Sequence, residues 1–120
     1  MTVGERNKKM NLTGVPETML QTIYARAKES KGRGAICDKK AEEIVSRLDY
    51  DFSLADKDTA MHSGVIARTI VLDRLTTAWL ATHPGGVVVN IACGLDTRCY
   101  RMKGYAHWYN LDLPERWPCV

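Results

Sequence analysis

The stretch Val87–Arg98, VVVNIACGLDTR, decides the fold class. An apolar, β-branched run that is bounded by turn residues is typical of a strand buried on both faces of a parallel sheet. The run ends in a small-residue turn that contains Gly94. Asp96 then stands where it can cap a short helix over 97–102. The stretch therefore predicts a strand, a loop and the start of a helix.

A second strand is predicted over 107–111, with Asp112 at its carboxyl end. Three helices are predicted before the first strand, because apolar residues recur there at helical spacing. The first begins after Thr13 and ends at Gly32 and Gly34, the second begins after Asp38, and the third covers about 63–80. The acidic segment 49–58 is predicted to be a connector, and the apolar face of the third helix is assigned to Ile66, Ile70, Leu72, Leu75, Ala78 and Trp79.

These elements predict an α/β chain with a helical region before a β-α-β unit whose sheet is incomplete. We expect a flexible N-terminus over 1–12, a helical cap region over 13–86, and the start of a cofactor-binding domain over 87–120.

Composition excludes several other classes of function. The chain has 120 residues, a formal net charge of +3 and 45% hydrophobic residues, so the basic excess is too small to indicate nucleic acid binding. Its four cysteines have no C-x-x-C spacing, so no metal site is expected. The sequence has no apolar run of the about 18 residues that a membrane span needs, and from its first residues we expect no secretory signal. We expect a cytoplasmic protein with reduced thiols.

The junction after the first strand suits a nucleotide-like cofactor. A glycine lets the backbone approach a ligand closely, and an acidic residue after the next strand can accept the hydroxyl protons of a ribose. Gly94 and Asp112 stand 18 residues apart, which fits this arrangement. A dinucleotide is disfavoured because Ala92 and Thr97 occupy positions where that motif needs glycine. A turn glycine and a strand-end aspartate without any ligand remain the alternative reading of the same pattern.

The segment Asn90–Met102, NIACGLDTRCYRM, resembles the first motif of the leucine carboxyl methyltransferase family, which includes O-methyltransferases of tetracenomycin-type polyketide synthesis. The L-D-T-R after the glycine is the most particular part of this likeness. Segments 17–30, 38–52, 64–73 and 108–115 resemble the family's preceding helices and its second strand, in order and spacing. The resemblance implies a Rossmann-like class I methyltransferase that uses S-adenosylmethionine to methylate a carboxyl or hydroxyl oxygen.

The resemblance also implies where the cofactor would bind. Arg68 matches the arginine that holds the cofactor's carboxylate, and Asp112 matches the residue that holds the ribose hydroxyls. The backbone around Gly94 would lie against the cofactor. The full set of predicted cofactor-binding residues is Arg68, Ala92, Cys93, Gly94, Asp96 and Asp112. No catalytic residue is predicted, because methyl transfer depends mainly on alignment of the acceptor and exclusion of water.

The family's acceptor-binding elements come later in its fold, and this chain departs from the family pattern at Arg116–Val120. Three interpretations follow. The chain is a truncated methyltransferase that carries a cofactor half-site and is too short to be active alone. Alternatively, it is an inactive fragment that self-associates or binds a complementing C-terminal half through an exposed sheet edge. In the third interpretation it is a small helical binding module, which the spacing of L-D-T-R and the acidic strand end argues against.

Overall fold

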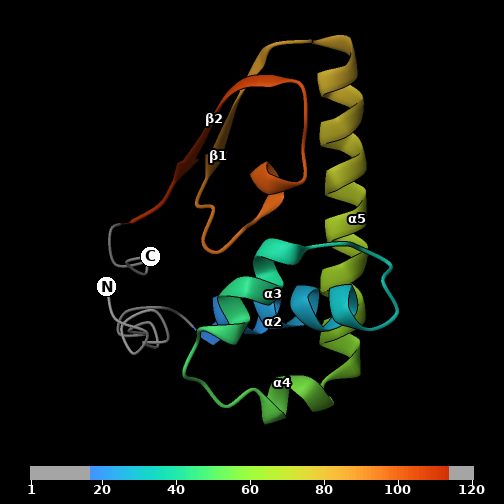
Figure 1. The fold of residues 1–120 in the computed structure, drawn as a ribbon, viewed down its shortest axis with the longest axis vertical. Coiled ribbons are helices and arrows are strands. Elements are labelled where there is room, and N and C mark those ends of the chain that lie inside the picture. Colours follow the sequence, from blue (N-terminus) through green and yellow to red (C-terminus); the bar gives the residue numbers. More distant parts are fainter. Residues whose placement is uncertain (1–16, 114–120) are drawn as a thin grey trace.

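The computed structural model describes residues 17–113. Four helices precede a parallel pair of strands: α2 (Glu17–Lys31), α3 (Lys39–Ser46), α4 (Ser53–Lys57), α5 (Thr59–Thr82), β1 (Gly86–Ile91), the 3₁₀ helix η1 (Arg98–Tyr100) and β2 (Tyr105–Leu111). Figure 1 shows α2, α3 and α4 around the N-terminal half of α5, with the strands beside its C-terminal half. The predicted α/β class is confirmed: this is an incomplete Rossmann-like fragment.

The helical region is held together by the apolar face of α2. Leu20, Ile23 and Ala27 recur at helical spacing and pack against Ala41 of α3 and Leu48. Leu95, from the loop after β1, packs against the same cluster. Burial of each large apolar side chain contributes about 1.5–3 kcal/mol. The core therefore joins the helices to the loop that the sequence singled out.

The helix boundaries follow local signals. The side chain of Asp38 caps α3 by accepting a 3.0 Å hydrogen bond from the amide of Ala41, as the sequence predicted. Asp58 caps α5 in the same way, through the amide of Met61. The third helix is therefore longer than the predicted 63–80. The acidic connector is not purely a loop, because α4 forms within it.

β1 and β2 pair in parallel, with Val89 opposite Tyr109 and Ile91 opposite Leu111. The prediction that β1 is buried on both faces is wrong for the described residues. Val87, Val89 and Ile91 are exposed by 51%, 53% and 76%. The sheet has only two strands in the described part of the chain, and these alternate side chains of β1 remain uncovered there.

The predicted apolar face of α5 is buried only near its N-terminal half. Ile66 is buried, whereas Leu72, Leu75, Ala78 and Trp79 are exposed. The reason is that the N-terminal half packs against α2, whereas the C-terminal half extends beyond the other helices (Figure 1). No helix within residues 17–113 is both long and apolar enough to cross a membrane.

Some sequence predictions lie outside the described residues. They are the flexible N-terminus over 1–12, the start of the first helix after Thr13, and the departure from the family pattern at Arg116–Val120.

Candidate cofactor-binding site

The loop after β1 lies at the carboxyl end of the parallel strands, next to the helical region (Figure 1). Ligands of open α/β sheets bind at this end of the strands. The amide of Asp96 donates a 2.9 Å hydrogen bond to the carbonyl of Cys93, which closes a tight turn. Gly94 lies within that turn at φ +53°, a left-handed conformation that favours glycine.

Ala92 has the same left-handed backbone, at φ +56°. A residue with a Cβ loses about 1–2 kcal/mol in this conformation. The strain falls at the end of β1, where the chain turns toward α2. Strained backbone of this kind concentrates at functional loops, where the surrounding structure compensates for it.

One pocket of about 210 Å³ lies where α2, α5 and this loop meet. It brings together five of the six predicted cofactor-binding residues: Arg68, Ala92, Cys93, Gly94 and Asp96. The other residues of its wall are outside the predicted cofactor-binding set and come mainly from α2 and α5: Met19, Thr22, Arg26, Val65, Thr69, Leu95 and Arg98.

The sixth predicted residue, Asp112, joins the site through the backbone. Its carboxylate accepts a 2.7 Å hydrogen bond from the amide of Gly94 and another of 2.7 Å from the amide of Leu113. Each carboxylate oxygen can accept more than one hydrogen bond. Asp112 therefore retains acceptor capacity for a ligand beside the loop.

Arg68 presents a cation to the pocket. Its side chain is exposed and has no hydrogen bond or ion pair with any residue of the described part of the chain. A guanidinium offers two parallel N–H donors to a carboxylate. Arg68 can therefore bind an anionic group without first breaking a protein contact.

Asp96 has a structural role in the loop. Its carboxylate accepts hydrogen bonds from the side chain of Asn90 (2.8 Å), the amide of Arg98 (3.1 Å) and the guanidinium of Arg98 (2.7 Å). The predicted helix after it is the short 3₁₀ helix η1, and its cap residue is Thr97 rather than Asp96. Asp96 bonds to the amide two residues ahead, and this local turn replaces the predicted helix cap.

Cys93 is buried, and its surroundings disfavour the thiolate form. Burial raises its pKa, and the nearby carboxylates of Asp112 and Asp96 raise it further. A thiol with a raised pKa is a poor nucleophile. This agrees with a packing role for Cys93 in the loop.

Met19 covers the loop from the side of α2. A Cβ on Gly94 would lie 3.1 Å from the Cε atom of Met19. Methionine is flexible and fills irregular gaps, so this side chain can shift when a ligand approaches Gly94. The only sequence signal for Met19 was its place on the apolar face of the first helix.

A network of three arginines and three aspartates surrounds the loop, formed by Arg26, Arg98, Arg101, Asp38, Asp73 and Asp96. Sequence analysis named Asp38 only as a helix cap, and it did not assign Asp73 or Arg101. The ion-pair partners of Asp73 and Arg101 stand 25–63 residues away along the chain, so no local pattern indicates the pairing.

Comparison with known proteins agrees with the geometry. A profile of the leucine carboxyl methyltransferase family matches residues 19–117. The chain is 40% identical over 109 residues to the tetracenomycin polyketide synthesis O-methyltransferase TcmP of Streptomyces glaucescens, a match that covers 88% of this chain and 40% of TcmP. It is 35% identical over 119 residues to an S-adenosyl-L-methionine-dependent methyltransferase of Gibberella zeae, covering 89% of this chain and 40% of that protein.

The chain spans about 40% of the length of these curated relatives. No solved structure matches it. The family match extends over the helices, the glycine loop and both strands, and it includes every residue that lines the pocket. The chain therefore belongs to the leucine carboxyl methyltransferase family.

Proposed function

We propose that this chain carries the S-adenosylmethionine half-site of an O-methyltransferase that acts on a carboxyl or hydroxyl oxygen. The observation that carries the proposal is the convergence of Arg68 and the Ala92–Asp96 loop on one pocket, with Asp112 bonded to the amide of Gly94. Membership of the family, and the S-adenosyl-L-methionine dependence of the Gibberella relative, support this choice of cofactor.

The residues fit part of the cofactor. The guanidinium of Arg68, which has no partner among residues 17–113, suits the carboxylate of its amino-acid end. The carboxylate of Asp112 suits the hydroxyls of its ribose. The pocket, at about 210 Å³, is smaller than the about 300–1,000 Å³ of most small-molecule sites. This volume agrees with a half-site in which Met19 must shift and in which other polypeptide would complete the wall.

When bound, S-adenosylmethionine would supply a methyl group on a positively charged sulfur. The chain's own residues would hold and orient it: Arg68 at one end, Asp112 at the other, and the Gly94 loop between them. A carboxylate acceptor needs no general base at neutral pH, whereas a hydroxyl acceptor is helped by one. We assign the acceptor to neither class, and we expect the chain by itself to be inactive.

Calorimetric titration of the chain with S-adenosylmethionine tests the proposal. We expect Arg68→Gln to weaken binding by about tenfold, because it removes a charge-assisted bidentate contact. Arg74→Gln is the matched control, because Arg74 is also exposed on α5 and does not line the pocket. A folded chain that shows no binding, or equal loss in both variants, would contradict the half-site.

A second candidate function is association with another polypeptide. Parallel sheets are normally covered on both faces, whereas five apolar side chains on one face of this sheet are at least half exposed: Val87, Val89, Ile91, Tyr109 and Leu111. A groove of about 360 Å³ also runs between α5 and β1, lined by Leu75, Thr76, Trp79, Val87, Val88 and Val89.

This groove follows the free edge of β1. Successive side chains of a strand point to opposite faces, so a groove that touches Val87, Val88 and Val89 together runs along the strand's edge. In the described residues β1 pairs with β2 alone, which leaves backbone donors and acceptors on its other edge. We propose that the occupant is an apolar strand that pairs in parallel with β1. The greater length of the relatives shows that related proteins contain further polypeptide that could supply one.

Sedimentation of the chain with the part of TcmP that has no counterpart here tests this second candidate. We expect a complex that Val89→Arg weakens, because Val89 lines the groove that the added strand would occupy. Leu54→Arg is the control, since Leu54 is 76% exposed on α4. If both variants weaken the complex equally, docking at the sheet is contradicted. If the chain instead associates with itself through this surface, the occupant is a second copy of the chain and not the proposed strand.

A further inference from the structure

We propose that Asp38 is a positioning residue that holds the Cys93–Thr97 loop in its ligand-binding shape. This inference rests on the proposed function, because the loop is the central part of the half-site. It begins from the burial of Asp38, whose side chain is 0% exposed. A buried carboxylate needs charged partners and hydrogen bonds to offset its lost hydration.

The partners of Asp38 come from both the helical region and the loop. Its Oδ2 atom accepts hydrogen bonds from the hydroxyl of Thr97 (2.6 Å), from Nη1 of Arg101 (3.0 Å) and from Nε of Arg26 (3.3 Å). Its Oδ1 atom accepts the amide of Ala41 at the start of α3. One carboxylate therefore caps a helix and binds the end of the loop, 59 residues away.

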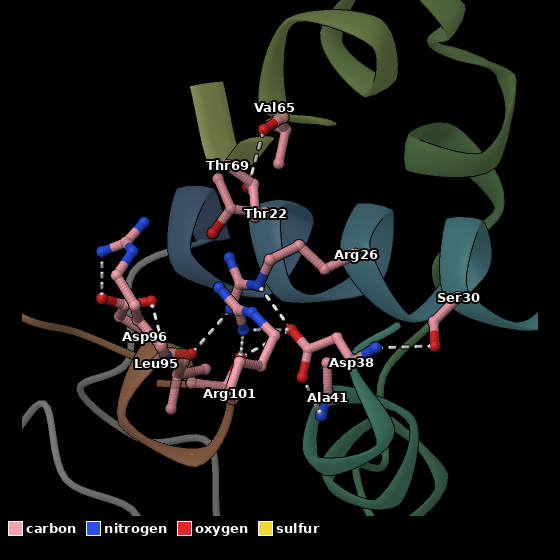
Figure 2. Close-up of polar contacts among 12 residues, drawn as sticks. Thr22, Arg26, Ser30, Asp38, Ala41, Val65, Thr69, Leu95, Asp96 and Arg101 are labelled. Carbon is pink, nitrogen blue, oxygen red and sulfur yellow. Dashed lines mark hydrogen bonds and ion pairs between the residues drawn. The ribbon is translucent and has the colours of Figure 1, made fainter. Parts of the chain in front are cut away.

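Arg26 carries the connection to the middle of the loop. While its Nε atom donates to Asp38, its Nη2 atom donates a 2.7 Å hydrogen bond to the carbonyl of Leu95. Figure 2 shows the guanidinium groups of Arg26 and Arg101 on the same side of the Asp38 carboxylate, the side that faces the loop, with Arg26 reaching toward Leu95. Asp38 thus acts on Leu95 through Arg26 and on Thr97 directly.

Arg101 connects the same carboxylate to α5. Its guanidinium donates to both oxygens of Asp73, at 2.9 Å each, and to the hydroxyl of Thr97 at 2.7 Å. Asp73 also accepts from Arg98, which in turn binds Asp96. Because Arg68 also lies on α5, the network fixes the loop relative to the helix that presents the cation of the pocket.

The network has no net charge, because its three arginines balance its three aspartates. The loop that it holds contains left-handed backbone at Gly94, next to the strained Ala92. Such backbone persists only where surrounding contacts over-determine it. Asp38 accepts directly from Thr97 and also from Arg26, which donates to the carbonyl of Leu95. Removing the charge of Asp38 should therefore release the loop and leave the helices in place.

Asp38→Asn separates positioning from capping. Asparagine is as good a helix cap as aspartate and has nearly the same shape, but it lacks the charge that balances Arg26 and Arg101. Asp58→Asn is the matched control, because Asp58 caps α5 in the same way and has no arginine partner in the described part of the chain. A merely structural or capping role would be disturbed similarly by both changes.

Two measurements are made on the full chain. In the absence of ligand, we expect Asp38→Asn to speed amide hydrogen exchange at Gly94 and Asp96 by about tenfold or more. Exchange at Ala41 should stay within about twofold, because the cap is retained. In titration with S-adenosylmethionine, we expect about tenfold weaker binding by the folded variant. Asp58→Asn should leave the loop exchange and the binding unchanged.

Loop exchange and affinity that remain as in the wild-type chain would overturn the proposal. So would a uniform rise of exchange at Gly94, Asp96 and Ala41, because that would show a general loss of stability. If the wild-type chain fails to bind S-adenosylmethionine, the proposed function fails, while the exchange measurement still decides whether Asp38 holds the loop. Thr97→Val removes the 2.6 Å hydrogen bond to Asp38 and the 2.7 Å hydrogen bond from Arg101, and it should reproduce the loop effect if Asp38→Asn folds poorly.

Discussion

The amide of Gly94 donates a 2.7 Å hydrogen bond to the carboxylate of Asp112, 18 residues further along the chain. The two residues follow neighbouring parallel strands, and the carboxyl ends of such strands meet at one edge of the sheet. The acidic residue therefore does more than end a strand: it fixes the backbone of the loop that lies beside the pocket.

Substitution of Asp112 tests both the loop contact to Gly94 and the proposed contact to the cofactor. We expect Asp112→Ala to reduce affinity for S-adenosylmethionine by more than tenfold, because it removes a charge-assisted bond to Gly94 and the proposed ribose acceptor together. Calorimetric titration measures the effect, and Asp49→Ala, a change at an exposed aspartate, is the control. Unchanged binding by Asp112→Ala would remove Asp112 from the site.

The left-handed backbone at Gly94 predicts that replacement by alanine destabilises the fold. Gly94→Ala places a Cβ at φ +53° and 3.1 Å from Met19, so we expect it to lower the free energy of unfolding by about 2 kcal/mol. Gly104→Ala has φ +87° and no atom within 4 Å of its new Cβ, and should lose only about 1 kcal/mol. Denaturant unfolding measures both values, and equal losses would show that contact with Met19 has no cost.

Glu29 makes stability depend on acidic pH. Hydrogen bonds from Arg33, His62 and the amide of Ala35 lower the pKa of this carboxyl from 4.5 to about 2. Because the pKa of Glu29 is lower in the folded state than in the unfolded state, its carboxylate stabilises the fold fully at a pH above the unfolded-state pKa. This stabilisation is lost as the pH falls from about 4.5 to about 2. The free energy of unfolding, measured across this pH range, should decrease as the pH falls, and this decrease should be smaller in Glu29→Gln. Glu43→Gln, which removes an exposed carboxylate, should retain the loss, and an identical profile for all three proteins would contradict this role.

The cysteines should differ in reactivity. Cys37 is exposed, whereas Cys93 is buried and has a raised pKa, so we expect iodoacetamide to modify Cys37 much faster at mildly alkaline pH. Peptide mapping after timed alkylation measures both rates in one sample. Bound S-adenosylmethionine should slow modification at Cys93 further and leave Cys37 unchanged. Rapid labelling of Cys93 in the folded chain would show that the loop opens readily.

Local sequence determined the elements and the class of fold. Apolar spacing places Leu20, Ile23 and Ala27 on one face of α2, and Asp38 caps α3, because both signals act within a few residues. The β-branched run before Gly94 and the acidic residue after the next strand were enough to predict a parallel pair with a cofactor-type loop. The family motif added Arg68, which no local pattern distinguishes from another helix arginine.

Tertiary structure decided what these residues contact. The sequence predicted a β1 buried on both faces and a continuous buried face on α5, but exposure of Val89 and Leu75 depends on which elements are available to cover them. It gave Asp38 one role, whereas folding places its carboxylate against Thr97, 59 residues away. Capping depends on neighbours in the chain and can be predicted from sequence; the arginine–aspartate network depends on how helices and strands pack, which the local pattern does not contain.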